Sequence, residues 1–142
     1  MEIIRRCEEA INAQISGDHE LLTDFLDDFY RGKFDMNERQ ALIGHLSQIF
    51  YASDALRKSL VLHVLSKFDG IVAAGVARDA IEDVYNDFRF LGAYLNQLVH
   101  AIAEGEGLFV SSCSIEADKN MRLAYALINR KEIVNGDFLV KN

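Results

Sequence analysis

The side chains that most often carry chemistry are few in this chain, and they lie far apart. The four histidines are His19, His45, His63 and His100, and no two have the four-residue spacing that presents two ring nitrogens on one helical face. His63 lies inside the apolar run LVLHVL, where we expect a hydrogen-bonded core or interface histidine. These spacings predict no catalytic residues, no cofactor and no local metal motif, although folding could bring histidines from separate helices together.

The two cysteines, Cys7 and Cys113, show no metal-type or CxxC spacing. Cys7 falls on the apolar face of the first predicted helix and should be a small buried side chain. Cys113 precedes a predicted helix whose N-terminus would favour a thiolate, but no histidine stands near it to act as a base. This pattern favours an ordinary loop cysteine and a reducing, cytoplasmic location.

One glycine pair resembles part of a phosphate-binding loop. Gly70 and Gly75 occupy the first and sixth positions of such a loop, but Val76 and Ala77 stand where Lys and Ser or Thr would be needed. We therefore expect a close approach of helices at these glycines, and no phosphate site.

Carboxylates form the clearest polar cluster. They project together from one predicted helix because residues three and four apart are neighbours on its surface: Glu20, Asp24, Asp27 and Asp28. One interpretation is a solvated face, with Arg31 relieving Asp27 one turn away. A second is a docking surface for a basic partner, and a third is a divalent-metal site, although the oxygen-ligand pattern of an EF-hand is missing.

Composition points to a mainly α fold. The chain has 142 residues, half of them hydrophobic (50%), and no proline (Pro 0), which favours long uninterrupted helices in a single domain spanning residues 1–142. The formal net charge of -7 makes nucleic acid an unfavourable partner. No signal peptide is apparent, and the longest apolar stretch, roughly residues 70–77, is too short to cross a membrane.

Apolar spacing predicts several short helices and one long one. Helices are expected at residues 2–16, from Asp18 to Gly32, from the capping pair Asp35 and Glu38 to about residue 50, and at 53–68. Residues 77–104 read as one helix with this apolar stripe: Ile81, Val84, Phe88, Leu91, Leu95, Leu98 and Ile102. We predict a five- to six-helix bundle, or stacked helical hairpins, around that long helix.

The C-terminal segment predicts a helix and a small β-hairpin. The helix would span residues 114–130, and Asn135-Gly136 is typical of a two-residue hairpin turn. Four basic residues make this segment an alternative DNA-binding element: Lys119, Arg122, Arg130 and Lys131.

Phe90 and Tyr94 lie one turn apart, well off the main stripe of the long helix. Either other helices cover them, or they anchor a partner or a second copy of the chain. The leading hypothesis is a non-enzymatic protein-binding module, such as an adaptor or an inhibitor covering a basic surface. The acidic residues would steer the partner, and the two rings would anchor it. A DNA-binding regulator and an enzyme with a site built from separate helices are the second and third hypotheses.

Overall fold

A computed structural model describes residues 1–85, 92–105, 108–110 and 138–140, and side chains are described for residues 1–80 and 97–105. Within these ranges the chain is helical apart from two short strands. The elements are α1 (Glu2–Ile15), α2 (Glu20–Tyr30), α3 (Met36–Ala52), α4 (Ala55–Phe68), α5 (Gly70–Tyr85), α6 (Gly92–Gly105), β1 (Leu108–Val110) and β2 (Phe138–Val140).

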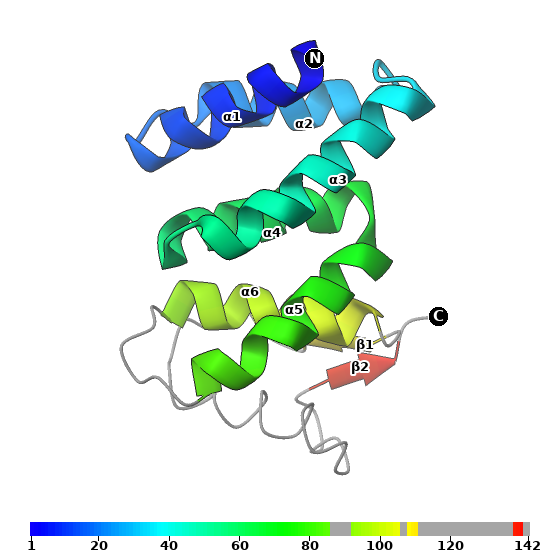
Figure 1. The fold of residues 1–142 in the computed structure, drawn as a ribbon. Coiled ribbons are helices and arrows are strands. Elements are labelled where there is room, and N and C mark those ends of the chain that lie inside the picture. The colour runs from blue at the N-terminus through cyan, green and yellow to red at the C-terminus, as the bar shows by residue number, and fades with distance from the viewer. Residues whose placement is uncertain (86–91, 106–107, 111–137, 141–142) are drawn as a thin grey trace.

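The described helices form three antiparallel hairpins stacked one on another (Figure 1). The first helices of the hairpins, α1, α3 and α5, contact one another in sequence and form one layer. The second helices, α2, α4 and α6, lie side by side in the other layer (Figure 1). Of the two predicted helical arrangements, the stacked hairpins describe this part of the chain.

The prediction of one long helix over residues 77–104 is wrong. Helix α5 begins earlier, at Gly70, and ends at Tyr85, and α6 begins at Gly92 and packs along α5. The apolar stripe has the same helical period in both pieces, so it could not reveal that the chain folds back on itself.

Helix α4 takes the central place that the long helix was expected to hold. It contacts α1, α3, α5 and α6. Its apolar centre is buried on several sides, with Val61, Leu62, Val64 and Leu65 fully inaccessible, as the run LVLHVL predicts. One hydrophobic core extends from Ile3 on α1 to Ile102 on α6.

Local sequence signals set several helix ends. Asp35 and Glu38 form the predicted capping box, in which each side chain accepts a hydrogen bond from the other residue's backbone N–H. Gly17 and Gly32 follow α1 and α2 with φ of +95° and +71°, a conformation that glycine adopts without steric cost. Asp54 caps α4, one residue after the expected start at Ser53.

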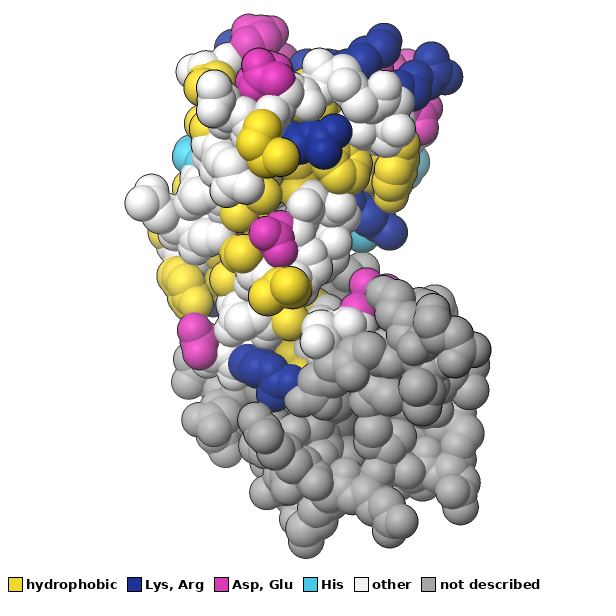
Figure 2. All heavy atoms as spheres, turned by 90° about the vertical axis from the view of Figure 1, so that its right-hand side faces the viewer, with side chains coloured by type: hydrophobic (Ala, Val, Ile, Leu, Met, Phe, Trp, Pro, Cys, Tyr) yellow, Lys and Arg dark blue, Asp and Glu magenta, His cyan; other side chains and the backbone are white. Residues whose placement is uncertain are grey.

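An aromatic cluster fastens α2 to α4. The Phe68 ring of α4 stacks on Phe29 of α2, with their ring centroids 4.1 Å apart, and also on Phe25 at 5.8 Å. The guanidinium of Arg39 lies 5.0 Å from the centre of the Phe29 ring. On the edge of the stack seen in Figure 2, hydrophobic side chains reach the surface among Lys and Arg side chains. The contacts of the Phe68 ring with Phe29 and Phe25 fix the spacing between the α1–α2 hairpin and the α3–α4 hairpin.

The close approach of helices involves a different glycine from the expected pair. A Cβ on Gly70 or Gly75 would meet no atom within 4 Å, whereas a Cβ on Gly105 would overlap that of Ala74. Gly105 therefore lets the end of α6 lie directly against α5.

The two strands pair antiparallel, with Phe109 opposite Leu139. The predicted turn at Asn135-Gly136 and the predicted helix at 114–130 lie outside the described residues, so the C-terminal hairpin stays a prediction.

Candidate functional site

A groove with both polar and apolar lining runs across the layer formed by α2, α4 and α6. It consists of two adjoining pockets that share two lining residues, His63 and Gln97. The first pocket, of about 380 Å³, lies between the α1–α2 region and α4 and is also lined by Gln14, His19, Leu22, Thr23, Leu26, Ser59 and Leu60. The second, of about 180 Å³, lies between α4 and α6 and is also lined by Ser66, Lys67, His100, Ala101 and Glu104. We call the two together the α2–α4–α6 groove.

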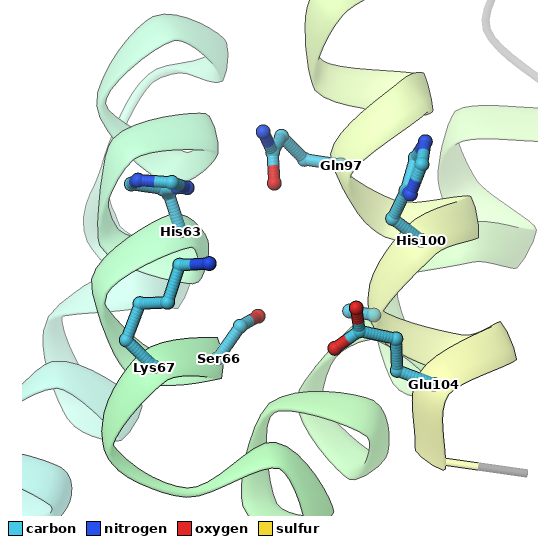
Figure 3. A pocket seen from close by; sticks show the side chains of 7 residues that line it. His63, Ser66, Lys67, Gln97, His100 and Glu104 are labelled. Atoms are coloured by element: carbon cyan, nitrogen blue, oxygen red, sulfur yellow. The ribbon is translucent and has the colours of Figure 1, made fainter. Parts of the chain in front are cut away.

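Helical spacing places these side chains on facing walls. On α4, Ser59, His63 and Lys67 follow one another at intervals of four residues. On α6, Gln97, His100 and Glu104 advance by three and four residues and therefore share one face. Figure 3 shows Ser66 and Lys67 of α4 and Gln97 and Glu104 of α6 extending toward a common space.

Both histidines of the second pocket are held in their neutral form. Burial lowers the pKa of His63 below its usual value, and the positive charge of Lys67 lowers it further. Burial also lowers the pKa of His100, against a smaller opposing effect of Glu104. At neutral pH each ring therefore offers one donor and one acceptor nitrogen.

His100 carries an unsatisfied polar atom. Its Nε2 is shielded from solvent and has no hydrogen-bond partner among the described residues. Leaving such an atom unpaired costs about 1–3 kcal/mol. Unsatisfied buried groups of this kind are uncommon in native proteins.

Most of the other polar side chains of the second pocket also have no hydrogen-bond or ion-pair partner among the described residues. Among the described residues, Lys67, Gln97 and Glu104 form neither a hydrogen bond nor an ion pair. Ser66 is the exception, because its hydroxyl donates to the carbonyl of Leu62, 2.8 Å away. The pocket thus presents an ammonium, a carboxylate, an amide and two neutral imidazoles to whatever enters it.

His63 differs from its expected role. It is half-buried, but it makes no hydrogen bond to another described residue, and it lines both pockets instead of lying within the core. The useful signal in the sequence was a polar residue at the centre of an otherwise apolar run. Its neighbours from α6 were missed, because they come from the second half of what read as a single helix.

The histidines do not gather into a metal site in the part of the chain that is described. No three side chains of His, Cys, Asp or Glu lie close enough there to hold an ion together. His45 lies elsewhere, with its Nε2 2.7 Å from a carboxylate oxygen of Glu8, and links α3 to α1. The groove therefore offers hydrogen bonds and charge.

The acidic cluster lies apart from the groove. Asp24, Asp27 and Asp28 line a shallow depression with Arg6 and Arg31, whereas Glu20 is exposed and does not line it. Arg31 shares that depression with Asp27 but does not form an ion pair with it in the described structure.

Asp28 already forms two ion pairs within the fold. Its carboxylate lies 2.7 Å from the Arg6 guanidinium and 3.2 Å from the Lys33 ammonium. The hydrogen bonds from these two groups hold the pKa of Asp28 below its usual value. Arg6 also lies over the rings of Phe25 and Phe34, so Asp28 helps to fix α1 against α2.

The remaining candidate residues cannot be placed. Phe90 and the side chain of Tyr94 lie outside the described part of the chain, as do Cys113 and the basic residues Lys119, Arg122, Arg130 and Lys131. Cys7 is fully buried, as expected, and burial raises the pKa of its thiol to about 12.

Comparison of the chain with models of known families, with curated proteins and with solved structures found no match. In the described ranges, none of the helices has the length and apolar character that a membrane span requires.

Proposed function

We propose that this chain is a non-enzymatic protein-binding module that holds an extended segment of a partner protein in the α2–α4–α6 groove. The observation that carries the proposal is the set of polar groups without interaction partners that line two adjoining pockets with His63 and Gln97 in common. An extended backbone exposes N–H and C=O groups that need partners once water is excluded. The Gln97 amide and the neutral ring of His63, shared by both pockets, can each donate and accept.

The size of the groove suits a short segment. Packed helix axes lie about 8–10 Å apart, so the line across three neighbouring helices is about 16–20 Å long. An extended chain advances about 3.3 Å per residue, which corresponds to about five or six residues. This recognition would use side-chain partners along the groove, because helices leave no backbone edge for strand addition.

The charge of the chain favours a partner with a basic surface. The formal net charge is -7, and the carboxylates of Glu20, Asp24 and Asp27 are exposed on α2. Such charges accelerate encounter more than they strengthen the final complex. Asp28 contributes less to this steering than the sequence suggests, because Arg6 and Lys33 already neutralise it.

Binding is favoured over catalysis by the state of the pocket's groups. Histidines and a carboxylate from separate helices do line this one pocket, as an assembled active site would require. However, the Ser66 hydroxyl donates to a backbone carbonyl, and within the described structure no carboxylate orients His63 or His100 by a hydrogen bond. An activated nucleophile needs an adjacent base, and that base needs a third group that orients it.

The proposal is tested by selecting short random peptides displayed on phage against the full chain. In a groove-filled variant, Thr23→Arg with Ser59→Arg, long side chains enter the first pocket from α2 and α4. The matched control is Gln40→Arg with Gln48→Arg on α3, which adds the same charge away from the groove.

We expect peptides that bind the wild-type chain and the α3 control equally well and lose at least about tenfold in affinity for the groove-filled variant, a loss of about 1.4 kcal/mol. Peptides that bind all three proteins equally, or the absence of any selected peptide, would contradict the proposal.

A further inference from the structure

We propose that the pocket between α4 and α6 receives an arginine side chain of the partner segment. This inference rests on the proposed function and adds to it the chemistry of the anchoring residue. The pocket is lined by His63, Ser66, Lys67, Gln97, His100 and Glu104 (Figure 3).

Hydrogen-bond acceptors are prominent among these groups. The Glu104 carboxylate only accepts, and the Ser66 oxygen can only accept because its proton is already donated to Leu62. The neutral ring of His63 adds an acceptor nitrogen, and Gln97 adds its amide oxygen. An arginine guanidinium carries five N–H donors and no acceptor, and therefore complements this set.

The volume of the pocket also points to a single side chain. At about 180 Å³ it is smaller than the roughly 300–1,000 Å³ usual for sites that enclose a whole small molecule. It shares His63 and Gln97 with the first pocket, so a segment lying in the first pocket could direct one side chain into it.

Charge favours arginine over a neutral donor such as citrulline. Glu104 is the pocket's one carboxylate in the described structure, and it has no ion-pair partner there. Lys67 opposes a cation, but its side chain is exposed and long enough to turn toward solvent. Arginine is also favoured over lysine, because its planar fork binds a carboxylate with two hydrogen bonds and stacks on flat rings.

The inference is tested with blocked arginine, N-acetyl-arginine N-methylamide, titrated into the isotope-labelled full chain and followed by NMR. Blocked citrulline is the probe control, because it has nearly the same shape without the charge. The protein variants are Glu104→Gln, Lys67→Gln and, as a matched charge control on α1 outside the groove, Glu9→Gln.

We expect blocked arginine to shift the signals of His63, Gln97 and His100. Its affinity should fall about tenfold or more in Glu104→Gln, because hydrogen bonds to a charged partner are the stronger ones. Affinity should rise in Lys67→Gln and stay unchanged in Glu9→Gln.

Equal binding of blocked citrulline, or equal affinity of Glu104→Gln and Glu9→Gln for blocked arginine, would overturn the inference. If peptides that lack arginine bind the groove in the display selection, the protein-binding proposal stands and the arginine anchor is wrong. The two proposals therefore fail on different results.

Discussion

Lys67 on α4 and Glu104 on α6 line one pocket from facing helices without forming an ion pair with each other (Figure 3). Some opposite charges elsewhere on the described surface do pair, as Arg5 does with both Glu2 and Glu9, whereas Arg31 and Asp27 share a depression without pairing. A charged side chain that faces the pocket without an ion-pair partner can direct its charge and its hydrogen bonds to a ligand. This relationship distinguishes the groove from the acidic cluster on α2, where Asp28 is already neutralised.

His100 should show a trade-off between stability and binding. Replacing it by phenylalanine removes the unpaired Nε2 and keeps a flat ring, so we expect His100→Phe to raise the free energy of unfolding by about 1 kcal/mol. The same variant should bind groove-selected peptides more weakly. Urea unfolding and a peptide titration measure the two effects. A loss of stability would instead assign His100 a structural role.

Acid should destabilise the fold through the two groove histidines. The pKa of both His63 and His100 is lowered from the ordinary value of 6.5, so the unfolded chain binds more protons near that pH. The free energy of unfolding should therefore fall as the pH drops through 6.5 toward the lowered values, and be unaffected by these groups at higher pH.

The double variant His63→Gln with His100→Gln isolates this effect. Its unfolding free energy, measured by urea titration between about pH 8 and pH 5, should depend less on pH than that of the wild type. Identical pH profiles for the two proteins would show that neither ring resists protonation.

The contact between Gly105 and Ala74 should govern the packing of α6 on α5. A Cβ at position 105 would overlap that of Ala74, so we expect Gly105→Ala to lower the free energy of unfolding by about 1–3 kcal/mol. Combining it with Ala74→Gly should restore part of the loss, and thermal unfolding of the four proteins of this cycle measures the coupling. If the changes in unfolding free energy caused by the two substitutions simply added, the contact between the two positions would be contradicted.

These sites also show what could be learned from the sequence. Helical periodicity and capping residues such as Asp35 and Glu38 identified most of the helices, because these signals are local. The fold-back between Tyr85 and Gly92 was missed, because the two halves of the apolar stripe continue the same period. The groove was missed for the same reason, since His63 and His100 line one pocket only once α6 packs beside α4.

Asp28 and Asp27 should respond differently to neutralisation. Asp28→Asn breaks contacts to both Arg6 and Lys33 and should lower the melting temperature. Asp27→Asn, the matched control on the same helix, should leave it nearly unchanged, because Asp27 is exposed and unpaired among the described residues. Thermal unfolding at low salt tests the difference, and equal effects would show that the Asp28 pairs contribute nothing.

The Cys7 thiol should not react with thiol reagents in the folded protein. Its thiol is fully buried and its pKa is raised to about 12, so very little thiolate forms at neutral pH. In a Cys113→Ser background, a thiol reagent such as dithionitrobenzoate should react only after denaturation. Rapid reaction of the native variant would show that α1 opens readily.

The central claim is that partner segments bind across α2, α4 and α6, and chemical-shift mapping tests it most directly. A peptide selected by display is titrated into the isotope-labelled full chain, and the backbone and side-chain signals are followed. The account predicts the largest shifts at His63 and Gln97, the two residues shared by both pockets, with little change on α3 and on α1 apart from Gln14, which lines the first pocket. Shifts concentrated on α1 and α3, with His63 and Gln97 unmoved, would contradict it.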